Sequence, residues 1–178
     1  MMNLNTKIFL KINNLIGKSK IMDAFGRAGG EFVIFGCIGW YFVSVLVGAS
    51  ALEKTYLYLA VLPVAWIFAW ALDLAIVFLV RENRPQIQMP EIKQMFKPMM
   101  SWKSFPSDHA MSAFLIFFLA LLFGLPFVSG LFILALWVSW GRVYCGVHYP
   151  LDILAGFLTA LVSSLFIYYC LLALNLIF

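Results

Sequence analysis

The chain contains two histidines, and each lies in a short polar cluster next to a long apolar run. His148 and Asp152 are four residues apart, a spacing at which two side chains on one helix can touch. A carboxylate hydrogen-bonded to one imidazole nitrogen fixes the tautomer and makes the other nitrogen a better nucleophile. His109 comes from the second cluster and could protonate a leaving oxygen as a general acid. The pattern therefore indicates nucleophilic chemistry on His148.

Three arginines accompany these residues, Arg81, Arg84 and Arg142. The planar guanidinium group matches the oxygens of a phosphate. The stretch FPSDHA, residues 105–110, is expected to begin a helix, where free N–H groups and the helix dipole favour an anion. Ser107 could cap that helix and also donate to a phosphate oxygen. Phosphoryl transfer needs mainly positioning and charge stabilisation, which these groups can supply without a metal.

The elements that must position these residues are membrane helices. Hydrophobic residues make up 64% of the 178-residue chain and charged residues only 11%, far from the composition of a soluble domain. A spanning helix needs ~20 apolar residues, so the chain has room for about five spans. The expected spans are residues 32–51, 56–80, 109–128, 129–147 and 150–178.

Two further segments complete the expected architecture. Residues 1–25 mix lysines and asparagines with apolar residues at helical spacing, which predicts an amphipathic helix on the membrane interface. Residues 81–106 are a polar, proline-containing loop on the side of the site. We therefore predict an all-α polytopic membrane helix bundle that forms a single domain over residues 1–178.

Alternation of five spans places every candidate site residue on one face of the membrane. Charged groups at membrane depth usually face the interior of a bundle or a wet cavity. The set that converges in this way is Arg81, Arg84, Ser107, Asp108, His109, Arg142, His148 and Asp152. Two alternatives stay open: Arg142 could be an ion-pair partner of Asp152, and Arg81 could reach the lipid headgroups instead of a phosphate.

The polar clusters resemble the motifs of the type 2 phosphatidic acid phosphatase superfamily. GRVYCGVHYPLD, residues 141–152, resembles its third motif, PSDH, residues 106–109, its second, and Arg84–Pro85 the end of its first. The resemblance implies a helical core related to vanadium haloperoxidases. It also implies a phosphohistidine intermediate on His148, which Asp152 would orient, with His109 as the general acid. The phosphate contacts that it implies come from Arg84, Ser107 and Arg142.

Three positions depart from the family pattern. Val77 stands where the first motif has a lysine, and Arg81, one helical turn later, could replace it. Gly141 stands where a serine is usual before the third-motif arginine, and Asp108 replaces the glycine of the second motif. Asp108 is grouped with the phosphate-binding residues by position, although its carboxylate would repel a second phosphate unless it turns away as a helix cap.

The implied function is hydrolysis of a lipid phosphate or diphosphate. FPSDH without a first-motif lysine resembles the bacterial undecaprenyl-diphosphate phosphatase branch, which makes undecaprenyl diphosphate the first candidate substrate. Phosphatidic acid and phosphatidylglycerol phosphate stay open, as does a non-catalytic lipid-phosphate binder or transporter. We expect a lipid partner in the bilayer, no nucleic acid, no cofactor and no metal, and the sequence does not determine the oligomeric state.

The charge pattern and the resemblance disagree about orientation. The net charge is +4, and most lysines and arginines fall on the expected site face. The positive-inside rule would place that face in the cytoplasm. The resembled enzymes instead work on the outer face, and on that resemblance we expect an integral protein of a bacterial or archaeal cytoplasmic membrane with an extracytoplasmic site.

Overall fold

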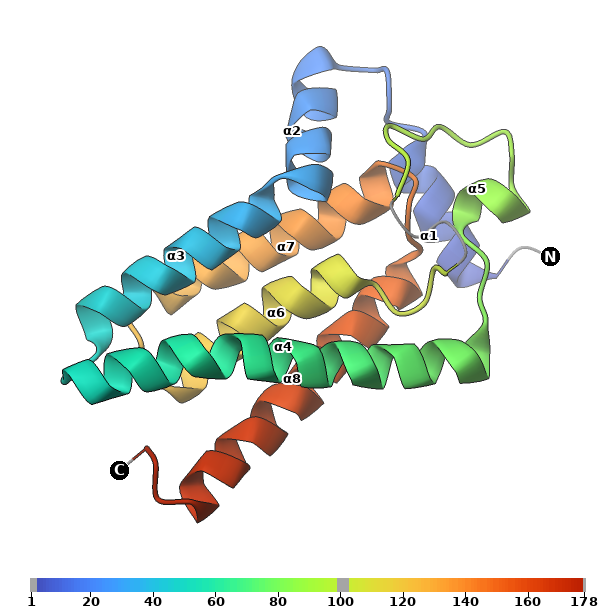
Figure 1. Ribbon diagram of the computed structural model, residues 1–178. Helices are drawn as coiled ribbons and strands as arrows, with labels where there is room; N and C mark the ends of the chain where they lie inside the picture. Colours follow the sequence, from blue (N-terminus) through green and yellow to red (C-terminus); the bar gives the residue numbers. More distant parts are fainter. Residues whose placement is uncertain (1–2, 99–102, 178) are drawn as a thin grey trace.

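The computed structural model describes residues 3–98 and 103–177, and the described part is helical (Figure 1). Its helices are α1 (Leu4–Asn13), α2 (Lys20–Glu31), α3 (Val33–Gly48), α4 (Leu52–Val80), α5 (Pro85–Gln88), α6 (Asp108–Leu122), α7 (Val128–Tyr144) and α8 (Pro150–Ala173). No strand occurs in the described residues. The predicted all-α class is confirmed.

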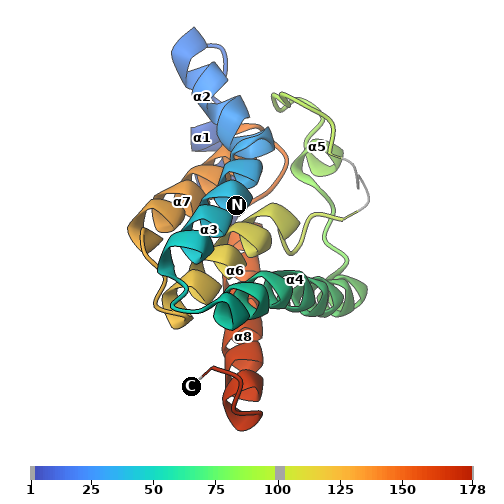
Figure 2. The same cartoon turned by 60° about the vertical axis from the view of Figure 1, so that its left-hand side comes forward.

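Helix α6 is the centre of the bundle. It packs against α3, α4, α7 and α8, and Figure 2 shows these four helices around it. The residues of α6 are apolar on nearly every side, as expected for a helix with neighbours all round. Because the candidate residues Asp108 and His109 begin α6, the most enclosed helix of the fold also carries the second motif.

The five predicted spans each coincide with a helix, namely α3, α4, α6, α7 and α8. By length and apolar composition, two stretches among the described residues can cross a membrane, Leu52–Gln88 and Pro150–Ala173. A third is formed if α2 and α3, which meet at a 59° bend, act as one span. Helices α6 and α7 are apolar but shorter. A total of five spans therefore stays a prediction.

The N-terminal segment is two helices, where the sequence predicted one amphipathic helix over residues 1–25. Gly17 adopts a left-handed conformation with φ +85°, which interrupts the helix. Ser19 then starts α2 by accepting a hydrogen bond from the backbone of Met22, and Asp23 accepts from the backbone N–H of Gly17. This local turn therefore divides the predicted single helix into α1 and α2. The two helices lie at the same end of the bundle as α5 (Figure 1).

Candidate active site

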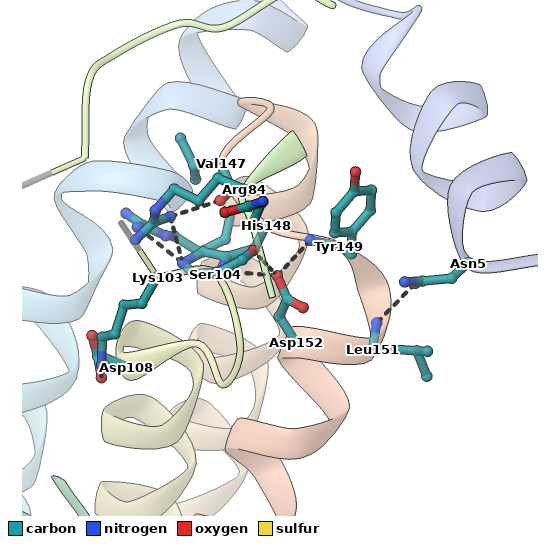
Figure 3. A network of polar contacts seen from close by, with 12 residues as sticks. Asn5, Arg84, Lys103, Ser104, Asp108, Val147, His148, Tyr149, Leu151 and Asp152 are labelled. Atoms are coloured by element: carbon teal, nitrogen blue, oxygen red, sulfur yellow. Dashed lines mark hydrogen bonds and ion pairs between the residues drawn. The ribbon is translucent and has the colours of Figure 1, made fainter. Parts of the chain in front are cut away.

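His148 and Asp152 form the centre of the site, at the turn into α8. Nδ1 of His148 lies 3.2 Å from Oδ2 of Asp152. The same carboxylate oxygen accepts hydrogen bonds from the backbone N–H of Tyr149, at 2.9 Å, and from the hydroxyl of Ser104. Asp152 therefore caps α8 and orients the imidazole at once (Figure 3). Both residues are buried, which excludes water from the pair.

Two guanidinium groups approach the other imidazole nitrogen. Nη1 of Arg84 lies 3.2 Å and Nη2 of Arg142 lies 3.4 Å from Nε2 of His148. Each arginine is also held by a backbone carbonyl, Arg84 by Val147 at 2.7 Å and Arg142 by Gly30 at 2.8 Å. Nε2 is thus flanked by two fixed cations.

The burial and these cations determine the charge of the histidine. His148 lies in the loop between α7 and α8, and only 2% of its surface is exposed. Burial, followed by the charges of Arg142 and Arg84, lowers the pKa of His148 well below its usual value. The imidazole is therefore neutral near pH 7, as a nucleophile must be.

Close helix packing places the arginine and the start of α6. A Cβ on Gly141 would overlap the backbone of Gly29 and Gly30, so glycine is required where α7 meets α2. This contact lets Gly30 bind the neighbouring Arg142, and it explains why the serine of the family pattern is absent. On α8, a Cβ on Gly156 would lie 2.7 Å from the carbonyl oxygen of Ser107.

The start of α6 presents Ser107 and His109. Ser107 is the N-cap residue, but the predicted side-chain cap is wrong, because its hydroxyl makes no capping hydrogen bond. The buried hydroxyl has no partner among the described residues and remains available to a ligand. The backbone N–H of Ser107 donates to the carbonyl of Asp152 at 3.1 Å, which joins the second and third motifs.

His109 lies at the polar end of an apolar groove of about 500 Å³ between α3, α4 and α6. Asp108 and Ser112 share this end of the groove. The remaining lining residues are hydrophobic apart from the indole N–H of Trp66, which donates to Ser112. A hydrocarbon chain would fit such a surface, and His109 would then be next to its headgroup.

Asp108 and Arg81 are placed differently from the other candidates. Oδ1 of Asp108 lies 2.6 Å from Nζ of Lys103, so this carboxylate is engaged by a cation. Arg81 follows the end of α4 in a left-handed conformation with φ 48°, and its side chain is exposed. It lines a small pocket of about 220 Å³ together with Val77 and Lys103. The structure brings neither residue into contact with His148.

Two contacts and one buried cation at the site had no clear sequence signal. Ser104 binds Asp152 across 48 residues, and Phe96 lies over the guanidinium of Arg142 at 5.4 Å. Lys103 is buried, although it belongs to a loop that the sequence predicts to be polar. The predicted alternative of an Arg142–Asp152 ion pair is not found among the described residues, since each has other partners.

Comparisons with known proteins point to one family. The family model described as PAP2 superfamily matches residues 58–176, about two thirds of the chain. The bacitracin transport permease protein BcrC of Bacillus licheniformis is 36% identical over 86 residues, 48% of this chain and 42% of that protein. The putative undecaprenyl-diphosphatase YbjG of Escherichia coli K12 is 47% identical over 64 residues, 35% of this chain and 32% of that protein. The matches thus cover less than half of each relative.

Two solved structures share the fold. Aquifex aeolicus LpxE superposes with a TM-score of 0.71 at 24% identity, over 94% of this chain and 96% of that chain. The PAP2-type phosphatidylglycerolphosphate phosphatase of Bacillus subtilis gives a TM-score of 0.63 at 19% identity, over 95% and 87%. Together with the family match and the membrane-length helices, these findings show that the chain is an integral membrane protein of the PAP2 superfamily.

Proposed function

We propose that this chain is a lipid phosphatase that forms a phosphohistidine on His148 and works without a divalent metal. The supporting observation is the surroundings of the imidazole. Asp152 holds Nδ1 at 3.2 Å, while Arg84 and Arg142 stand 3.2 and 3.4 Å from Nε2. A phosphorus atom bonded to Nε2 would lie among donors for its equatorial oxygens, where the transition-state charge develops.

The proposed reaction has two steps, phosphorylation of His148 and hydrolysis of the phosphohistidine. The lone pair of Nε2 attacks phosphorus, the bond from phosphorus to the leaving oxygen breaks, and His109 gives a proton to that oxygen. Water then attacks the phosphorus, the bond to Nε2 breaks, and His109 takes the proton released by the water. Asp152 stabilises the positive charge of the imidazole during the first step. Ser107, with its unpaired buried hydroxyl, donates to a phosphate oxygen.

The apolar groove supports a lipid as substrate. Its walls include Ile34 and Phe35 of α3 and Leu62 of α4, and it ends at His109. A lipid chain in this groove would leave its phosphate oxygen next to the proposed acid. The phosphate would then extend from His109 toward the two arginines. A water-soluble phosphate would make no use of these walls.

Undecaprenyl diphosphate is the first candidate substrate. Its support is the sequence similarity to YbjG, described as a putative undecaprenyl-diphosphatase, which is restricted to 64 residues. Phosphatidylglycerol phosphate and phosphatidic acid are the rival substrates. The active site is proposed to open on the extracytoplasmic face.

Phosphate release by purified protein in detergent tests the proposal. The wild type is compared with His148→Ala on undecaprenyl diphosphate, phosphatidylglycerol phosphate and phosphatidic acid. Lys54→Met, at the opposite end of α4 from the site, is the control. We expect turnover of at least one lipid by wild type and control, and none by His148→Ala. Vanadate binding without turnover of any lipid would instead identify a binder.

Chelation tests the metal-independent mechanism. The two guanidinium groups at Nε2 already neutralise phosphate charge, so EDTA should leave the rate unchanged. Vanadate should inhibit, because its five-coordinate adduct resembles the transition state. Complete loss of activity in EDTA, restored by one divalent ion, would contradict this part of the proposal.

A further inference from the structure

Lys103 is a buried cation beside the proposed site. Its side chain is 1% exposed, and Nζ lies 2.6 Å from Oδ1 of Asp108, which is 26% exposed. The next residue, Ser104, donates its hydroxyl to Asp152 and its backbone N–H to the carbonyl of Glu82 at 3.1 Å. The loop that carries the lysine is therefore fixed to the catalytic aspartate and to the segment after α4.

The ammonium group of Lys103 contacts a residue that lines the groove, Asp108. Figure 3 shows the side chain extending from beside Ser104 to Asp108. The charge of Lys103 acts at the imidazole, where it joins the arginines in lowering the pKa of His148. At its other end, Asp108 lines the apolar groove with His109. A substrate phosphate that reaches from the groove to Nε2 would pass the ammonium.

We propose that Lys103 is a third cation of the phosphate-binding site, placed on the leaving-group side and positioned by Asp108. The inference rests on the proposed function. Removing an ammonium from water costs several kcal/mol, and one partly exposed carboxylate offsets only part of that. Among the described residues, Asp108 is the acceptor recorded for Nζ, although an ammonium has three donors. A phosphate oxygen would supply a second, charged acceptor.

This assignment differs from the sequence prediction that Arg81 replaces the lysine absent at Val77. Arg81 is exposed beyond the end of α4, where water and salt screen its charge. Lys103 lines the same small pocket as Val77 but is buried. The loop between α5 and α6 thus brings a lysine to the region where the family motif takes one from the helix. Asp108, the unusual residue of the second motif, is explained as its positioning partner.

Four variants test the proposal: Lys103→Met, Lys103→Arg, Asp108→Asn and the double variant Lys103→Met/Asp108→Asn. The measurements are kcat and KM on the best substrate of the panel and the inhibition constant of vanadate. We expect Lys103→Met to lower kcat/KM ~10²–10³-fold, the usual cost of a lost transition-state donor, and to weaken vanadate inhibition. Lys103→Arg should retain more activity. Asp108→Asn should lose less than about tenfold, because the cation remains.

The double variant distinguishes a role of Lys103 in phosphate binding from a purely structural role of the Lys103–Asp108 pair. It carries no unpaired buried charge, so it also keeps the test valid if Lys103→Met does not fold. The proposal requires the double variant to stay as inactive as Lys103→Met. Recovery to nearly wild-type rates would show that the pair is only structural, and so would full activity of Lys103→Met. Lys97→Met, which removes an exposed lysine of the same loop, is the matched control and should be unchanged.

Failure of the proposed phosphatase function would give a different result from failure of the Lys103 assignment. In that case the wild type releases no phosphate from any lipid, or His148→Ala remains active. Calorimetric binding of vanadate to the wild type and to the double variant then decides the role of Lys103. Weaker binding by the double variant supports the assignment, and equal binding overturns it.

Discussion

Oδ2 of Asp152 lies 3.2 Å from Nδ1 of His148, and the same oxygen accepts the N–H of Tyr149. One carboxylate oxygen thus fixes the start of α8 and the orientation of the imidazole. The arrangement couples helix capping to the proposed chemistry, because the turn that forms α8 also sets the direction of Nε2 toward the arginines. It also allows the two roles to be separated by mutation.

Asp152→Asn should abolish most activity while keeping the fold. An amide oxygen can still accept the N–H of Tyr149, so α8 remains capped. A neutral amide no longer stabilises an imidazolium and can favour the wrong tautomer, a change that costs ~10⁴ in kcat in a Ser-His-Asp triad. We expect kcat to fall ~10³–10⁴-fold with little change in the melting temperature. Ser104→Ala, which removes another donor to the carboxylate, should lose less. A large fall in melting temperature for Asp152→Asn would mean that capping dominates.

The low pKa of His148 should make stability depend on pH. The folded protein keeps His148 neutral, whereas the unfolded chain protonates it below its usual pKa near 6.5. Because the unfolded state then binds more protons, stability falls as the pH falls below 6.5, by up to ~1.4 kcal/mol per pH unit from this group. The melting temperature of wild type should therefore drop between pH 7.5 and pH 5.5. His148→Gln should show a smaller drop, and equal drops in both proteins would contradict the argument.

Gly141 should be intolerant of the serine that the family pattern favours. Any Cβ at this position overlaps the backbone of α2, and overpacking typically costs 1–3 kcal/mol. Gly141→Ala should therefore lower the melting temperature, and it should also lower kcat because it moves Gly30 away from Arg142. Gly36→Ala in α3 is the matched control, since nothing lies within 4 Å of its added carbon. Equal stability of the two variants would show that α2 shifts without cost.

The sequence predicted the helices of the bundle and the meeting of the motifs. Apolar runs located α3, α4, α6, α7 and α8, and the alternation of spans anticipated that Arg84, Arg142 and His148 converge. The break at Gly17, whose φ is positive, was missed because one glycine beside a helical pattern does not by itself predict a left-handed turn. The burial of Lys103 was missed because its acceptor lies on another element, and a charged loop residue is ordinarily solvated.

The contact between Gly30 and Gly141 shows a further limit of sequence reasoning. Each glycine is ambiguous on its own within an apolar helix. The need for a small residue arises only when α2 lies against α7, which is a tertiary property. The carbonyl that holds Arg142 was likewise unpredictable, since every residue offers one and only the fold selects Gly30.

Labelling of a new cysteine should decide the orientation of the site. Lys97 is exposed in the loop that carries Phe96, whose ring covers Arg142, so Lys97→Cys reports on the face that carries the site. The chain's own cysteines interfere little, because Cys37 and Cys145 are buried and Cys170 is partly buried. For an extracytoplasmic site, a membrane-impermeant maleimide should label this variant in intact cells, while the parent protein stays unlabelled. The lysines and arginines near the site argue for the opposite result under the positive-inside rule. Labelling only after the membrane is permeabilised would place the site in the cytoplasm and exclude a substrate presented from outside the cell.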